Sequence, residues 1–274
     1  MLFRSPGSRA PTDRGGKRLA GGALRGQGVS VLTAGEARTR LAELGFEPAA
    51  VNVLVAHFED ADRRGKRGHG LSRVEWLETL DFDPSARPVR LVAEDGFERW
   101  DGSGALGYLV LDEIVRATLA HPPEHARAIV AQRCFPTGVL GYWIRRLADG
   151  GLVAALTATS PRRLPHPEGG PPLTGTNPLA IGIPSSDGAP VVVDVSMGAV
   201  THGDVLSGVA QPGELVPFGG EQAHKAFALA VGIELLVSAL AGPEHGAVLI
   251  VAPPDHDPVS AFRALAAGRR LPGD

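Results

Sequence analysis

Between residues 89 and 252 the chain alternates short β-branched or apolar runs with segments whose apolar positions repeat at helical spacing. Such alternation requires a sheet covered by helices and predicts an α/β or mixed α+β fold. Strands are predicted at 89–95, 128–131, 152–159, 179–183, 190–195 and 246–252, and helices at 109–121, 138–148, 223–240 (a buried helix) and 258–267. The Pro-, Gly- and His-rich segment 161–172 is predicted to be a loop.

Two helices are predicted before this region. Thr33 and Glu36 form a capping-box pattern, and Gly45 follows the helix that they open. Pro48 suits the first turn of a second helix, which runs into the charged stretch 59–67. The chain therefore begins its folded part with a helical segment.

The first 28 residues carry six Arg or Lys side chains and one acid, with many glycines. They contain too few apolar residues to offset the entropy lost on ordering, so we predict a disordered basic tail. A nucleic-acid-binding tail is the alternative.

Composition excludes several classes of function. The net charge of −3 gives no bulk attraction to nucleic acid or to an anionic membrane, and no uninterrupted apolar run approaches the ~18 residues needed to span a bilayer. The single cysteine, Cys134, excludes an intrachain disulfide and favours a cytoplasmic location. The nine histidines show no metal-ligand spacing, so no metal site is predicted.

The first candidate site is the segment 68–73, Gly-His-Gly-Leu-Ser-Arg. Glycines on both sides of His69 allow a sharp turn that exposes the ring, and a histidine can exchange a proton with a carbonyl oxygen. The planar guanidinium of Arg73 suits a carboxylate held by two bonds. A solvated surface pair is the alternative interpretation.

Two further clusters suit phosphate groups. The segment 169–178 ends in Gly175, Thr176, Asn177 and Pro178, where free amides and short polar side chains can approach an anion. The segment 217–225 ends in His224-Lys225 at the start of the apolar helix, and helix N-termini favour anions. An ordinary tight turn and a solvated lysine are the respective alternatives. No Gly-x-Gly-x-x-Gly turn is present, so a Rossmann fold is not predicted.

Taken together and in this order, the clusters resemble the malate/L-lactate dehydrogenase family, which is unrelated to the Rossmann-type lactate dehydrogenases. The similarity runs from about residue 29 to 253. Five segments carry the similarity. Segment 68–73 resembles the family's Ser-His-Gly-Val-x-Arg element, 95–96 its Asp-Gly turn and 175–178 its Gly-Thr-Asn-Pro loop. Segment 194–196 resembles its Asp-x-Ser element, and 217–226 its Pro-x-Gly-Gly…His-Lys-Gly element.

The resemblance implies a non-Rossmann fold, with a helical part at 29–88 that packs with 227–274 and a dinucleotide-binding mixed-sheet domain at 89–226. It implies that His69 donates the proton and that Arg73 holds the carboxylate of a small-molecule substrate. It implies that NAD or NADP is held by Gly175, Thr176, Asn177, Pro178, His224 and Lys225, and that the protein is a homodimer.

This sequence departs from the family pattern at three positions and in length. Gly68 replaces a serine, Pro136 replaces a second histidine, and Ala226 replaces a glycine. The segment between Asp194 and Pro217 is short, and so is the C-terminal part. We predict an NAD(P)-dependent oxidoreductase of 2-hydroxy and 2-keto acids. The alternatives are a degenerate nucleotide-binding homologue that acts through dimerisation, and an unrelated activity on the same scaffold.

Overall fold

The computed structural model describes residues 32–273, which belong to one compact unit. Its main sheet has seven strands in the order β1-β2-β3-β9-β4-β7-β8, and β5 and β6 form a separate two-stranded sheet. The strands are β1 (Val89–Glu94), β2 (Phe97–Asp101), β3 (Arg127–Gln132), β4 (Val153–Ala158), β5 (Leu164–His166), β6 (Gly169–Thr174), β7 (Leu179–Ile183), β8 (Val191–Val195) and β9 (Ala247–Ala252).

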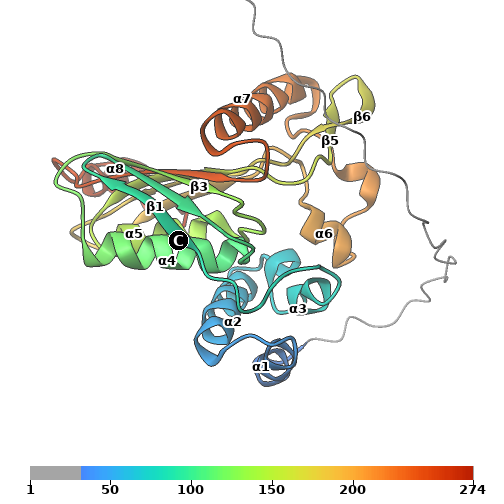
Figure 1. The fold of residues 1–274 in the computed structure, drawn as a ribbon. Helices are drawn as coiled ribbons and strands as arrows, with labels where there is room; N and C mark the ends of the chain where they lie inside the picture. Colours follow the sequence, from blue (N-terminus) through green and yellow to red (C-terminus); the bar gives the residue numbers. More distant parts are fainter. Residues whose placement is uncertain (1–31, 274) are drawn as a thin grey trace, which may run out of the picture. The chain divides into compact units, whose positions relative to one another are not determined.

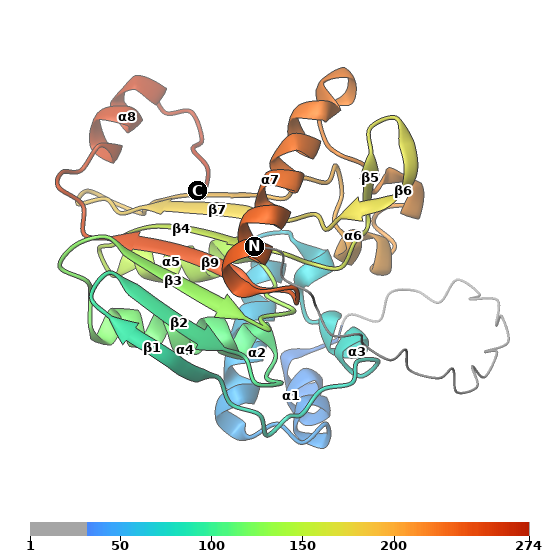
Figure 2. The ribbon, with the colours of Figure 1, turned by 45° about the horizontal axis from the view of Figure 1, so that its top comes forward.

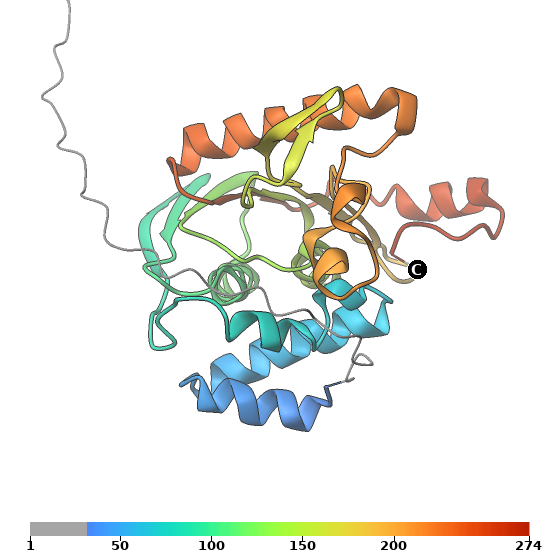
Figure 3. The same cartoon turned by 90° about the vertical axis from the view of Figure 1, so that its right-hand side faces the viewer.

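Helices cover both faces of this sheet. The α-helices are α1 (Ala34–Glu43), α2 (Pro48–Arg63), α3 (Arg73–Leu77), α4 (Gly107–Ala120), α5 (Leu140–Asp149), α6 (His202–Leu206), α7 (Ala223–Ala241) and α8 (Val259–Ala266). Short 3-10 turns are η1 (Arg67–His69), η2 (Pro212–Glu214) and η3 (Gly220–Gln222). In Figure 1, α4 and α5 lie under the sheet and α7 lies above it. Figure 3 shows α1 and α2 as a further layer beneath α4 and α5.

The sheet is mixed, which confirms the predicted fold class and the absence of a Rossmann arrangement. Strands β2 and β3 pair in parallel, and β9 pairs antiparallel with both β3 and β4. The last strand in the sequence therefore lies in the middle of the sheet (Figure 2). The larger apolar core fills the space between this sheet and helices α2, α4 and α5.

The N-terminal helices form for the reasons read from the sequence. The side chain of Thr33 accepts a hydrogen bond from the Glu36 amide, and the Glu36 carboxylate accepts one from the Thr33 amide at 2.8 Å. Gly45 follows α1 with φ +95°, a conformation that favours glycine. Pro48 is the first residue of α2. The predicted capping box, glycine stop and proline start are confirmed.

Several elements differ from the sequence predictions, and the short helix α3 is among those that were not predicted. Segment 161–172 is not a loop throughout, because residues 164–166 and 169–174 pair as a hairpin outside the main sheet, where prolines are tolerated. Strand β2 escaped prediction because Glu98 faces inward; its carboxylate accepts a hydrogen bond from the Trp100 indole at 2.8 Å and pairs with Arg127 at 3.1 Å. Helix α6 was not predicted.

Helix α7 is buried on one face only. Small and branched residues from Ala226 to Ala241 pack on the sheet in a second apolar cluster, whereas Leu235 is 64% exposed on the other side. Within residues 32–273, Gly220–Ala241 is the one helical segment long and apolar enough to cross a membrane by length and composition. The prediction of a buried helix was therefore only half right.

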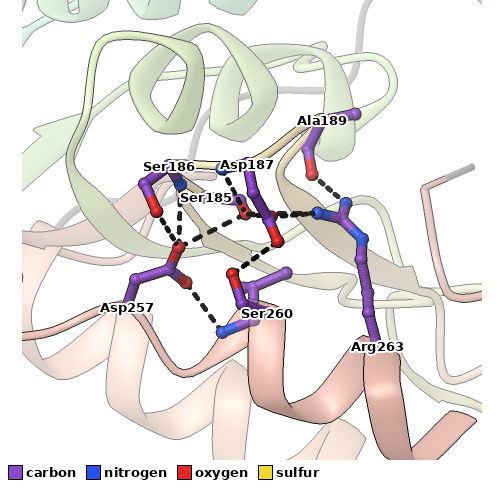
Figure 4. A network of polar contacts seen from close by, with 8 residues as sticks. Ser185, Ser186, Asp187, Ala189, Asp257, Ser260 and Arg263 are labelled. Atoms are coloured by element: carbon purple, nitrogen blue, oxygen red, sulfur yellow. Dashed lines mark hydrogen bonds and ion pairs between the residues drawn. The ribbon is translucent and has the colours of Figure 1, made fainter.

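A polar network fixes α8 against the turn between β7 and β8 (Figure 4). The Asp257 carboxylate accepts hydrogen bonds from the amides of Ser186 (2.8 Å) and Val259 (2.7 Å). The Arg263 guanidinium pairs with Asp187 at 3.1 Å. These bonds hold the C-terminal helix at the end of the sheet away from β5 and β6 (Figure 2).

The described part of the first predicted region, 32–88, and the second, 89–226, lie within one compact unit, and their separation as domains stays a prediction. Helix α2 packs on α4 and α5, while α7 packs on β3, β4 and β9. The predicted basic tail, 1–28, lies outside the described residues.

Candidate active site

A cavity of about 390 Å³ brings together parts of the chain that are far apart in the sequence. His69 and Arg73 line it, and so do Thr176 and Pro178 from the predicted dinucleotide loop. Half of the predicted site residues thus meet around one space. The remaining walls come from parts of segments 135–139, 159–163 and 194–204, and from Gly65, Lys66, Trp76 and Tyr108.

His69 stands in a tightly bonded turn at the end of α2. Its amide donates to the Lys66 carbonyl at 2.8 Å, and the Leu71 amide donates to the Asp62 carboxylate at 2.9 Å. The ring is partly buried, and its Nδ1 has no hydrogen-bond partner among residues 32–273. The turn therefore fixes the backbone of His69 while one buried ring nitrogen is left without a protein partner.

Gly68 has a structural reason to replace the family's serine. A Cβ atom at Gly68 would lie 2.5 Å from the Asp204 nitrogen and from the Gly203 carbonyl carbon, which belong to α6. Helix α6 therefore packs directly on the turn that carries His69. The short segment after Asp194 still covers this side of the cavity. Its helix α6 approaches the backbone at residue 68 so closely that only glycine fits there.

Arg73 opens α3 and is only 8% exposed. Its guanidinium carbon lies 3.7 Å from the centre of the Trp76 ring, a cation–π arrangement. Within the described part of the chain, its Nε and Nη1 atoms are buried without a hydrogen-bond partner, as is the hydroxyl of Tyr108, which also lines the cavity. A buried guanidinium without a partner is costly, and an anionic ligand would satisfy it.

The surroundings hold the cavity histidines in the neutral form at pH 7. Burial, and next the charge of Arg73, lower the pKa of His69 to about 4 although Asp204 and Asp194 oppose this. Burial, and next the charges of Arg163 and Arg73, lower the pKa of His202 to about 4 as well. A neutral His69 can accept a proton without prior deprotonation.

Lys66 and Asp194 form an ion pair at 2.5 Å on the cavity wall. The pair joins the turn that bears His69 to the end of β8. Because Lys66 already has a carboxylate partner, it is a weaker candidate than Arg73 for holding an added anion.

The loop 175–178 combines cavity residues with structural ones. Asn177 is fully buried; its amide nitrogen donates to the Ala230 carbonyl at 3.0 Å and to the Glu234 carboxylate at 2.7 Å. A Cβ atom at Gly175 would meet the Ser160 backbone and the Asn177 side chain. Gly175 and Asn177 therefore shape the loop, and Thr176 and Pro178 face the cavity.

His224 and Lys225 lie at the start of α7, exposed and outside the cavity lining. Their role and those of the other site residues stay predictions. No group of three or more His, Cys, Asp or Glu side chains between residues 32 and 273 is placed to hold a metal ion.

Sequence reasoning missed Tyr108, Arg163 and His202, which all line the cavity. Tyr108 lies one residue before the helix predicted at 109–121, and His202 lies in an unpredicted helix; neither has a motif around it. The signal for Arg163 was present, because a pair of arginines inside a Pro- and Gly-rich segment is unusual. Pro136 also lines the cavity, so the family's second histidine position contributes no acid or base there.

The mixed sheet, which is not a Rossmann sheet, carries a pocket lined by two arginines and by a histidine whose pKa burial lowers. The chain belongs to the malate/L-lactate dehydrogenase family, whose model matches residues 34–211.

Among known relatives, a Δ(1)-pyrroline-2-carboxylate/Δ(1)-piperideine-2-carboxylate reductase of Pseudomonas syringae pv. tomato is 28% identical over 230 residues, which are 72% of this chain and 66% of the relative. A Δ(1)-pyrroline-2-carboxylate reductase of Pseudomonas fluorescens is 33% identical over 233 residues, covering 72% and 67%. The crystal structure of the P. syringae Δ1-piperideine-2-carboxylate reductase aligns with a TM-score of 0.75 at 24% identity, covering 88% of this chain and 89% of the other.

Proposed function

We propose that this protein is an NAD(P)-dependent oxidoreductase that transfers a hydride between nicotinamide and C2 of a small 2-hydroxy or 2-keto acid. One observation carries the proposal: the 8% exposed Arg73, whose Nε and Nη1 have no hydrogen-bond partner among residues 32–273, and the similarly unpartnered Nδ1 of His69 line the same cavity of about 390 Å³. The first group suits a carboxylate, and the second suits the neighbouring carbonyl or hydroxyl oxygen.

Oxidation of the substrate requires one base, His69, to take the hydroxyl proton. The substrate hydroxyl would give its proton to neutral His69, and a bound nicotinamide would accept the C2 hydride with its electron pair. The C–O single bond becomes a carbonyl, and Arg73 keeps the carboxylate in place. In the reduction direction protonated His69 returns the proton to the oxygen as hydride reaches C2.

The residues fit a nicotinamide cofactor, NAD or NADP, which supplies or accepts the hydride. Thr176 and Ser160 add hydroxyl donors to the cavity wall. The whole dinucleotide is larger than the cavity, so its phosphates must lie outside. We propose that the exposed His224 and Lys225 hold them there, while Gly175 and Asn177 shape the loop between.

The test measures NADH and NADPH oxidation with a panel of 2-keto acids and cyclic imino acids. We expect turnover by the wild type and a loss of at least about 100-fold in His69→Ala, in line with removal of a general acid or base. Cofactor binding, followed by nicotinamide fluorescence, should survive in the variant. Binding without turnover of any substrate would favour the non-catalytic homologue instead.

We also propose a homodimer, because the α7 face of the sheet is incompletely covered. Ile250 in central strand β9 is 53% exposed, and Leu235 and Leu236 of α7 are 64% and 50% exposed. An apolar face in the middle of a sheet is normally buried. A second copy of the chain would cover it. The buried, unpaired Cys134 fits the proposed cytoplasmic location.

A further inference from the structure

The hydroxyl of Tyr108 is a buried polar group in the wall of the cavity. Tyr108 is the second residue of α4, is 0% exposed, and lines the cavity of about 390 Å³ together with His69 and Arg73. Its hydroxyl has no hydrogen-bond partner among residues 32–273. Because a buried hydroxyl is costly to leave without a partner, the free protein holds a donor that a ligand can satisfy.

Close backbone packing fixes where this hydroxyl lies. A Cβ atom at Gly107 would lie 2.7 Å from the Pro136 carbonyl oxygen, so α4 begins directly against segment 135–139, which lines the cavity. A Cβ atom at Gly138 would lie 2.3 Å from Cε1 of Tyr108. Because Cε1 is bonded to the ring carbon that carries the hydroxyl, the hydroxyl also lies close to this wall.

The ring of Tyr108 is held by its aromatic neighbours. Phe58 and His57 meet it edge-on, with ring centres 5.4 and 5.0 Å away. His57 also accepts a hydrogen bond from the Val139 amide at 3.0 Å, so one histidine supports both the ring and the cavity wall. Rotation of the ring about its own axis leaves the hydroxyl oxygen in place. The donor is therefore positioned before any ligand binds.

The hydroxyl is protonated at neutral pH. Burial raises the pKa of Tyr108 above its ordinary value, and the opposing charge of Arg73 is the smaller effect. A neutral phenol donates one hydrogen bond and keeps its proton. Such a group suits an oxygen atom on which negative charge develops.

We propose that the Tyr108 hydroxyl donates a hydrogen bond to the C2 oxygen of the substrate and stabilises the negative charge that develops there during hydride transfer. This inference rests on the proposed function, in which Arg73 binds the carboxylate and His69 exchanges a proton with the C2 oxygen. Two bonds from Arg73 satisfy a carboxylate, whereas a carbonyl oxygen has two lone pairs and His69 occupies only one. Tyr108 supplies the second donor and transfers no proton.

The first test is Tyr108→Phe, which removes the hydroxyl and keeps the ring. We expect kcat for 2-oxobutanoate to fall about 10- to 100-fold with a smaller change in KM, because the charge on the oxygen is greatest in the transition state. Stability in urea should be equal or higher, because the variant loses an unsatisfied buried hydroxyl. A hydroxyl with only a structural role would give the reverse, a lower stability with an unchanged kcat.

Tyr142→Phe is the matched control, because Tyr142 is the only other tyrosine of the chain and lies outside the cavity lining. Its kcat should equal that of the wild type. An unchanged kcat in Tyr108→Phe, or an equal loss in both variants, would overturn the proposal.

NMR of protein labelled with ¹³C at tyrosine Cζ observes the contact without turnover. The two tyrosines give two signals, which the two variants assign. Without cofactor, 2-oxobutanoate should shift the Tyr108 signal and leave that of Tyr142 in place. Butanoate, which has the carboxylate but no C2 oxygen, should shift neither.

This measurement separates the inference from the proposed function. A shift caused by 2-oxobutanoate alone would support the contact with the C2 oxygen even if no substrate were turned over. An unshifted Tyr108 signal at saturating 2-oxobutanoate, with and without NADPH, would overturn the proposal, and so would an equal shift caused by butanoate.

Discussion

At the scale of single residues, the charge around His69 sets its protonation. Its pKa of about 4 results first from burial and next from Arg73. A substrate carboxylate on Arg73 would offset that second cause. We therefore expect the pKa of His69 to be higher in the substrate complex than in the free protein.

The pH dependence of the rate tests this expectation. The profile of kcat/KM reports groups of the free enzyme, and the profile of kcat reports those of the complex. The pKa assigned to His69 should be higher in the kcat profile. Coincident values in the two profiles would show that the carboxylate does not bind beside His69.

The same burial makes stability depend on pH. The pKa of His69 is about 4 in the folded protein against 6.5 when unfolded, and burial also lowers the pKa of His57. The unfolded chain thus binds more protons between pH 6.5 and 4, so stability is full above 6.5 and falls as the pH drops through this window. His69 alone accounts for about 3 kcal/mol.

Urea unfolding at several pH values between 7 and 4 measures this slope. His69→Asn should make it shallower, and His256→Asn, at an exposed turn, should leave it unchanged. An identical slope in wild type and His69→Asn would contradict the environment described for His69.

At the scale of elements, the contact between α6 and the turn at Gly68 determines the shape of the cavity. Gly68→Ala should push α6 away from His69, because its Cβ would lie 2.5 Å from backbone atoms of Gly203 and Asp204. We expect a destabilisation of about 1–3 kcal/mol and a lower kcat/KM.

Gly35→Ala in α1 is the matched control for that change. A Cβ there would have only the Thr33 hydroxyl, 4.0 Å away, as a neighbour, so the variant should be as stable as the wild type or slightly more so. If Gly68→Ala were also harmless in denaturant unfolding and in activity, the close packing of α6 would be refuted.

Local signals in the sequence predicted most elements but not their placement. The capping box at Thr33, the helix stop at Gly45 and the helix start at Pro48 depend only on neighbouring residues. The ends of these helices could therefore be predicted from the sequence. The central position of β9 depends on long-range pairing with β3 and β4, which no local pattern encodes. Apolar residues lie on every side of helix α7, so the sequence could not show which face is exposed.

At the scale of the whole molecule, the candidate site is assembled from distant segments. His69 and Arg73 could be proposed because they stand in one short motif, and Thr176 because of the family loop. Arg163 and His202 join them only through the tertiary fold, from the segment before β5 and from α6. The sequence therefore indicated His69, Arg73 and Thr176 but not Arg163 or His202, which also line the cavity.

The incompletely covered sheet face leads to a prediction on assembly. Ile250→Glu would place a charge in the proposed apolar interface and should convert a dimer into a monomer in analytical ultracentrifugation. Leu91→Glu, at the exposed edge strand β1, is the control and should remain dimeric. A wild-type monomer at micromolar concentration would contradict the proposed homodimer.

Transfer of an isotope label from the cofactor provides the sharpest test of hydride transfer to C2. The protein would be incubated with NADH or NADPH deuterated at C4 of the nicotinamide, with each face labelled in turn, and with the 2-keto acid panel. We predict deuterium at C2 of the hydroxy acid from one face only, observed by NMR, and none with Arg73→Gln at the same substrate concentration. Absence of deuterium in every product, with cofactor shown to bind, would contradict the account.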